Sequence, residues 1–84
     1  MVVGILDRDP HFEELFKKIK DKSFKEKVKK QIQKIIENPE IGKPMMYARK
    51  GTREVYISPF RLSYIYIRKE NKIILLDLYH KNKQ

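Results

Sequence analysis

The hydrophobic period of the chain changes once, near residue 40. Before that point, apolar side chains recur three or four residues apart: Phe12, Leu15, Phe16 and Ile19, then Phe24, Val28, Ile32, Ile35 and Ile36. This spacing gathers them on one face of a helix. After residue 40, apolar and polar side chains tend to alternate, which is typical of strands. The pattern therefore predicts helices first and a sheet second.

Local signals place the ends of two helices. Asp9 is a suitable N-cap and Pro10 a suitable first helical residue, so the first helix is predicted over about 10–21. Ser23 and Glu26 have the spacing of a capping box at the start of the second, which an Asn-Pro pair ends. Because the link is short, the helices are expected to form a hairpin that covers one sheet face.

The rest of the chain favours an antiparallel sheet. The strongest strands are "FRLSYIYI" and "KIILLDLY", joined by a turn at "RKEN" and apolar on both faces, as expected at the centre of a sheet. "TREVYI" and "MMYARK" read as further strands, and "MVVGIL" as a short strand or a buried arm. We expect an α+β fold, with a helical hairpin packed on one face of a curved, mainly antiparallel sheet of three to four strands.

Length limits what the chain can enclose. Its 84 residues predict a single domain over 1–84, because they leave no room for two independent cores. A domain of this size buries roughly 60–65% of its unfolded surface. We therefore expect any functional site to lie on an open face or in a shallow groove.

The charge balance indicates a polyanionic partner. Twenty Lys and Arg oppose eleven Asp and Glu, a formal net charge of +9. This excess favours nucleic acid, with the ribosome or an acidic protein as variants. A solvated lysine surface, as in heat-adapted proteins, is the alternative. The absence of cysteine excludes disulfides, and two histidines make a zinc site improbable, so no metal or cofactor is expected.

Arg61 is the main candidate for a functional side chain. It stands near the start of a largely apolar strand, and four of the five arginines lie in the strand half of the chain. If Phe60 and Leu62 face the helices, alternation directs Arg61 to the opposite face. Its planar fork of donors suits a phosphate. The alternative is a rim arginine paired with Glu54 or Asp77.

Other candidates follow the same strands. His80 and Lys81 end the last strand, where a histidine could exchange a proton near neutral pH or be an ordinary surface residue. His11 is expected to be structural or solvent-facing. Among the tyrosines, Tyr56 and Tyr79 are possible contacts to bases, and the others are expected in the core.

Several familiar chemistries have no motif here. The chain lacks a Gly-rich phosphate loop, a G-x-S-x-G elbow and an acidic cluster for magnesium. A nuclease built on it would have to act without metal, by attack of an RNA 2′-hydroxyl on the adjacent phosphate. No apolar run approaches the roughly 20 residues that span a bilayer, so a soluble, cytoplasmic protein is predicted.

The order of these segments resembles one known family. A helical hairpin followed by "REVYISPFRLSYIY", a short turn and "IILLDLYHK" resembles the RelE/ParE superfamily of type II toxin-antitoxin toxins. The similarity covers nearly the whole chain. Its most specific part is "FRLSYIY" with "LLDLYHK", which are similar to the Y-R-hydrophobic-x-Y strand of the family and to its last strand with a G-H-K/R-like end.

The resemblance implies roles for particular residues. In RelE-like members, which cut mRNA on the ribosome, the arginine that matches Arg61 contacts the scissile phosphate. Lys81 matches the basic residue after the last strand, and His80 a position that is histidine in several branches. Arg53 and Tyr56 lie where relatives place further basic or catalytic side chains. Many relatives have a basic residue at the position of Tyr56, which leaves the general base and acid open between His80 and Tyr56.

The resemblance also implies partners. We expect a cognate antitoxin, acidic in charge, together with mRNA and the ribosome, with no membrane and no small-molecule cofactor. The residues expected to bind RNA are Arg49, Lys50, Arg53, Lys29 and Lys30. Two alternatives remain: a ParE-like inhibitor of DNA gyrase, and a degenerate relative that only binds its antitoxin.

Overall fold

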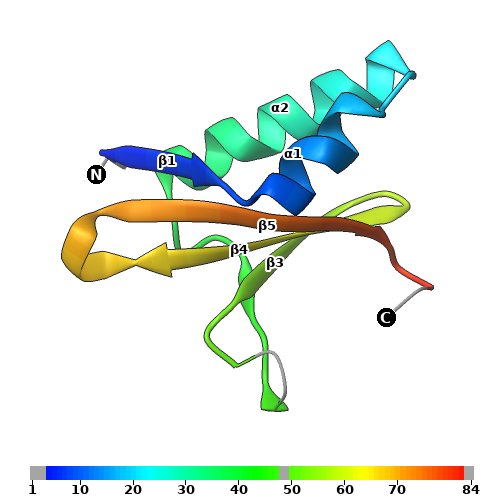
Figure 1. Ribbon diagram of the computed structural model, residues 1–84. Helices are drawn as coiled ribbons and strands as arrows, with labels where there is room; N and C mark the ends of the chain where they lie inside the picture. The colour runs from blue at the N-terminus through cyan, green and yellow to red at the C-terminus, as the bar shows by residue number, and fades with distance from the viewer. Residues whose placement is uncertain (1–3, 48–49, 83–84) are drawn as a thin grey trace.

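The computed structural model describes residues 4–47 and 50–82. Within these ranges the elements follow one another in an order of strand, two helices and four strands (Figure 1). They are β1 (Ile5–Arg8), α1 (Pro10–Lys17), α2 (Lys22–Glu37), β2 (Lys43–Pro44), β3 (Arg53–Ile57), β4 (Phe60–Ile67), the 3₁₀ turn η2 (Arg68–Glu70) and β5 (Lys72–His80).

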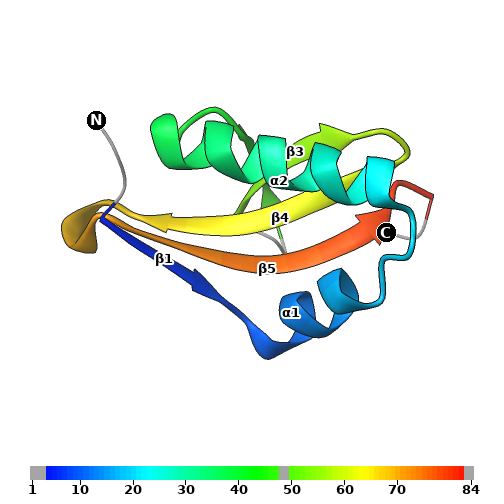
Figure 2. The ribbon, with the colours of Figure 1, turned by 90° about the horizontal axis from the view of Figure 1, so that it is seen from above.

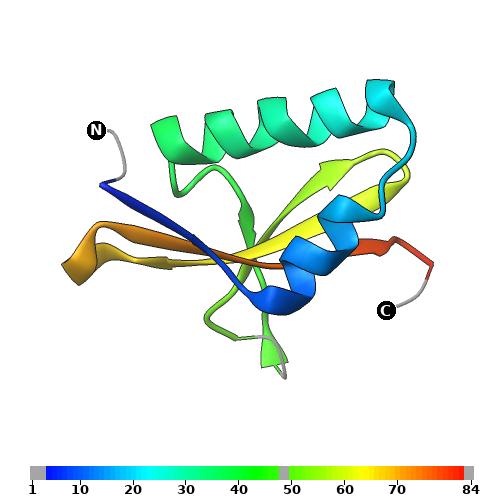
Figure 3. The same cartoon turned by 45° about the horizontal axis from the view of Figure 1, so that its top comes forward.

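The strands form one mixed sheet in the order β1-β5-β4-β3-β2. Its neighbours pair antiparallel except β1, which runs parallel to β5. Both helices cover the same face of the sheet (Figure 3). The predicted α+β fold is confirmed, with five strands instead of three or four because short β1 and β2 extend the two edges. No helix within the described ranges is long and apolar enough to cross a membrane.

The helix boundaries differ from the prediction at two points. Asp9 caps α1 as expected, by accepting a hydrogen bond from the His11 amide, but the helix ends at Lys17. The capping box predicted at Ser23 is wrong, because α2 begins two residues earlier, at Lys22. Its cap is Asp21, whose carboxylate accepts hydrogen bonds from the backbone amides of Ser23 and Phe24 at 2.9 and 3.3 Å.

The core lies between the helices and the two central strands. Its most buried side chains are Phe12, Val28, Ile35, Leu62, Tyr64, Ile73 and Leu75. On β4, Leu62 and Tyr64 belong to the core as predicted, although Ser63 between them is buried as well. On β5 the pairing with β4 shifts between Ser63 and Tyr64 and leaves one extra residue, Leu76, in β5. Leu75 and Leu78 can therefore both be buried.

The buried hydroxyl of Tyr64 fixes the loop that follows α2. It donates a hydrogen bond to the carbonyl of Pro39 at 2.7 Å and accepts one from the amide of Gly42 at 2.9 Å. A Cβ atom at Gly42 would lie 2.6 Å from this hydroxyl, so only glycine allows the approach. Burial raises the pKa of Tyr64 above its ordinary value of 10.0.

Replacing Tyr64 by Phe is expected to lower the free energy of unfolding by about 1–3 kcal/mol, because two buried backbone groups lose their partner. Denaturant unfolding measures this loss. Because the folded pKa of Tyr64 is raised, its contribution is present below pH 10 and is lost as pH rises further, so the difference from Y64F should shrink in alkali. A loss no larger than that of Tyr66→Phe, on the same strand, would contradict this assignment.

Candidate functional site

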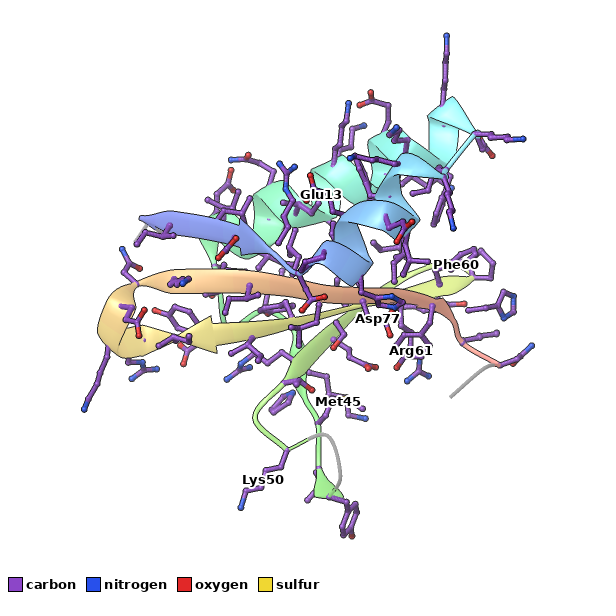
Figure 4. The ribbon with its side chains drawn as sticks, in the orientation of Figure 1. Glu13, Met45, Lys50, Phe60, Arg61 and Asp77 are labelled. Atoms are coloured by element: carbon purple, nitrogen blue, oxygen red, sulfur yellow. The ribbon has the colours of Figure 1, made fainter. Side chains whose placement is uncertain are left out.

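A row of three side chains crosses the face of the sheet that the helices leave uncovered. Strand pairing sets Tyr56 of β3 beside Arg61 of β4, and Arg61 beside Tyr79 of β5. Figure 4 shows Arg61 and its neighbour Phe60 on opposite sides of the sheet, with Phe60 toward the helices. The predicted direction of Arg61 is thus what the structure shows, and the row brings it together with two tyrosines.

A buried carboxylate lies beside this row. Glu54 is on the same face of β3 as Tyr56, and only 4% of its side chain is exposed. Its Oε2 atom accepts a hydrogen bond from the Tyr79 hydroxyl, and its Oε1 atom lies 3.6 Å from Nη1 of Arg61. The pairing of Arg61 with Glu54, the alternative interpretation, is therefore present. It compensates the burial of the carboxylate and anchors the arginine.

Arg61 nevertheless stays accessible. Of its side chain, 36% is exposed, and the 3.6 Å contact to Glu54 is longer than a hydrogen bond. The ion pair thus orients the guanidinium without enclosing it. An anion arriving at the open face can meet a cation that is already positioned.

Tyr56 is the most exposed member of the row, at 51%. Its hydroxyl donates to Oγ of Ser58 at 3.4 Å, and Nζ of Lys81 lies 5.9 Å from the centre of its ring. The hydrogen bond with Ser58, followed by the positive charges of Lys81 and Arg61, lowers the pKa of Tyr56 below 10.0. The surroundings thus make the Tyr56 hydroxyl easier to deprotonate than that of an ordinary tyrosine.

His80 and Lys81 are neighbours in sequence but point to different surroundings. His80 pairs with Phe60 across β4 and β5, and its ring contacts the Phe60 ring edge-on at 5.5 Å, on the helix side. Its Nδ1 accepts the amide of Asn82 at 3.2 Å. Lys81 extends toward Tyr56 instead. The structure thus brings Lys81, but not His80, to the face that carries Arg61.

A shallow groove of about 470 Å³ connects the row to the edge of the sheet. It is lined by Gln31, Ile41, Lys43, Met45, Glu54, Val55, Tyr56 and Arg61. The groove follows β3 beyond the short β2, which pairs only with Arg53 and Glu54. It is open to solvent, as the small size of the chain predicted, and can hold an extended ligand more readily than a compact one.

The two lysines of α2 that were expected to bind RNA lie on different sides of the helix. Lys30 borders a groove that it shares with Tyr56 and Ser58. Lys29 lies 3.8 Å from Glu26 and borders a separate groove beside Phe12. Only Lys30 therefore lies near the row.

The other residues expected to bind RNA are more distant or already engaged. Arg53 donates to the carbonyls of Glu40 and Gly42 at 3.1 and 2.8 Å, so its fork holds the loop after α2. Lys50 lies near the tip of the loop between β2 and β3 (Figure 4). Arg49 lies outside the described residues.

Sequence reasoning missed the role of Glu54 as the group that links Arg61 and Tyr79. A period of two already placed Glu54 on the same face as Tyr56, but its burial depends on the strands on either side. A second pair was also missed: Nε2 of His11 lies 3.1 Å from Oδ1 of Asp77, which joins α1 to β5. Among residues 4–47 and 50–82, no cluster of His, Asp and Glu could hold a metal ion.

A family model matches nearly the whole chain. The model describes the ParE toxin of the parDE type II toxin-antitoxin system, and it matches residues 7–84. No curated protein sequence matches significantly.

Solved structures of toxins share the fold. The toxin of the Escherichia coli RelBE complex has 19% identity, with 90% of this chain and 94% of that chain covered and a TM-score of 0.78. A chain of the RelBE2 toxin-antitoxin complex from Mycobacterium tuberculosis has 17% identity and a TM-score of 0.78, with 92% of this chain and 96% of that chain covered. A YoeB/ParE toxin from Agrobacterium tumefaciens has 14% identity and a TM-score of 0.81, with 90% of this chain and 96% of that chain covered. The resemblance to the RelE/ParE superfamily is confirmed.

Removing either Ser58 or Lys81 should raise the pKa of Tyr56. We expect Ser58→Ala and Lys81→Gln each to move it toward 10.0, because each deletes a group that favours the phenolate, while Lys81→Arg keeps it low. Ultraviolet titration of tyrosinate measures the shift, and Tyr56→Phe identifies the transition. An equal shift in Lys72→Gln, at the opposite end of β5, would rule out the local cause.

Proposed function

Because the chain belongs to the ParE toxin family of type II toxin-antitoxin systems, we propose that it is the toxin that cleaves mRNA on the ribosome, without metal. The observation that carries this proposal is the exposed Tyr56 with a lowered pKa, set between the cations of Arg61 and Lys81. Attack by a 2′-hydroxyl needs a proton acceptor and positive charge at the phosphate. This cluster offers both on one open face.

The proposed reaction assigns a role to each of the three. The Tyr56 phenolate takes the proton of the 2′-hydroxyl, whose oxygen then bonds to the adjacent phosphorus. Arg61 and Lys81 stabilise the charge that develops on the phosphate oxygens. The bond to the 5′ oxygen breaks, and in this proposal the Lys81 ammonium protonates that oxygen. The products are a 2′,3′-cyclic phosphate and a 5′-hydroxyl. His80 has no part, because β5 directs it toward Phe60.

The open groove supports a role for the ribosome. A groove this shallow cannot by itself enclose a nucleotide and align its 2′-hydroxyl with the phosphate. Much of the acceleration of such a reaction comes from alignment of the reacting atoms. We assign that alignment to the decoding site, which already holds mRNA in a fixed path. The antitoxin that pairs with this toxin is expected to be acidic, given the net charge of +9.

Programmed ribosomes with bound mRNA test the proposal. Purified toxin free of antitoxin should cut at fixed codon positions and leave 2′,3′-cyclic phosphate ends. Arg61→Ala should slow cutting by about 10²–10³-fold, because it removes one positioned donor to the developing charge. The control is Arg68→Gln, because Arg68 forms an ion pair with Glu40 and is not part of the row. Equal cutting by the Arg61 variant would refute the role of Arg61, and no cutting by folded wild-type protein would refute the enzyme.

A second candidate function is inhibition of DNA gyrase by binding. Two observations favour it: the family model that matches is that of the ParE toxin, and Glu54 offsets part of the charge of Arg61. A gyrase supercoiling assay distinguishes the two functions. Loss of supercoiling at stoichiometric toxin, with intact mRNA in the ribosome assay, would favour this second candidate.

A further inference from the structure

Helix α2 carries two stripes of lysine with identical spacing. Lys27, Lys30 and Lys34 form the first, and Lys22, Lys25 and Lys29 form the second. Successive residues of a helix are about 100° apart around its axis. The two stripes therefore lie on opposite sides of the buried face that carries Val28 and Ile35. Figure 2 shows β3 along one side of α2, and β1 and α1 on the other side.

The first stripe borders the edge of the sheet that carries the candidate site. A groove of about 290 Å³ lies between its three lysines and the end of β3, where it is lined also by Gln31, Tyr56, Ile57 and Ser58. Gln31 and Tyr56 line the larger groove of Arg61 as well. The two grooves therefore adjoin, and cationic side chains line one path from α2 to Arg61.

The second stripe has different surroundings. Nζ of Lys25 lies 4.9 Å from the centre of the Phe16 ring. Lys29 borders a groove lined by Leu6, Arg8, Phe12, Phe16 and Ile32, which is largely apolar. An apolar groove suits the apolar face of a peptide, whereas the groove of the first stripe offers lysines and polar groups, with Ile57 mostly buried at 4% exposure.

We propose that Lys27, Lys30 and Lys34 hold the phosphate backbone of single-stranded RNA on its way to Arg61. This subsite rests on the proposed function, in which RNA is the substrate. From Lys27 to Lys34 the helix rises about 10 Å, which is comparable to three stacked nucleotides at about 3.4 Å each. The exposed ring of Tyr56, at the junction of the two grooves, is placed to stack on a base.

Binding of a non-cleavable RNA tests this subsite separately from catalysis. The probe is a fluorescent 2′-O-methyl decauridylate, titrated with the toxin at several salt concentrations. Lys27, Lys30 and Lys34 are changed together to Gln, and the matched control changes Lys22, Lys25 and Lys29 to Gln. Both variants lose the same charge from the same helix, and circular dichroism verifies that each is folded.

The first variant should bind about 100-fold more weakly at 0.1 M salt, and the slope of log K against log salt should fall by about 2, since three phosphate contacts at about 0.7 each are lost. The control should lose much less.

Equal losses in the two variants, or no RNA binding by the wild type, would overturn the subsite. Preferential binding of a decaglutamate peptide to the first stripe would overturn it in favour of an acidic protein segment. If RNA binds as expected but is not cut on ribosomes, the proposed function fails while the subsite stands.

Discussion

The change of register between β4 and β5 is the constraint on which both the core and the candidate site depend. Its extra residue, Leu76, reverses which residues of β5 face the helices. Before it Ile73 and Leu75 are buried, and after it Leu78 is. Tyr79 consequently turns to the open face, where it meets Glu54. Without the extra residue, Tyr79 would pair with Phe60 and point toward the helices, and Leu78 would take its place beside Arg61.

Burial of Glu54 explains why the open face is ordered. A carboxylate at this position has lost most of its contact with water, so it needs partners. Arg61 supplies one from the neighbouring strand β4, and Tyr79 supplies another from β5, on the far side of β4. The same contacts fix the position of a cation on a surface where a long side chain would otherwise sample many rotamers. Order is thus built into the site before any ligand arrives.

Helix α2 separates two surfaces of different chemistry. One flank faces β1 and α1 across a largely apolar groove, and the other faces β3 across a basic groove. A toxin must be held by its antitoxin and must also reach its target. Under the proposed function, two grooves of unlike character would allow the two partners to be recognised by different forces, apolar burial on one side and phosphate neutralisation on the other.

The sequence by itself determined the local features of this protein. Helical spacing predicted α1 and α2, alternation predicted β4 and the direction of Arg61, and the charge predicted a polyanionic partner. These features depend on residues near one another in the chain, so they can be read from period and composition. Only the tertiary structure decided which residues of β5 face the helices, the burial of Glu54, the separation of His80 from Lys81, and the different surroundings of Lys29 and Lys30. Each of these is set by the strand or helix packed alongside, because pairing across the sheet, and not sequence spacing, decides which side chains meet.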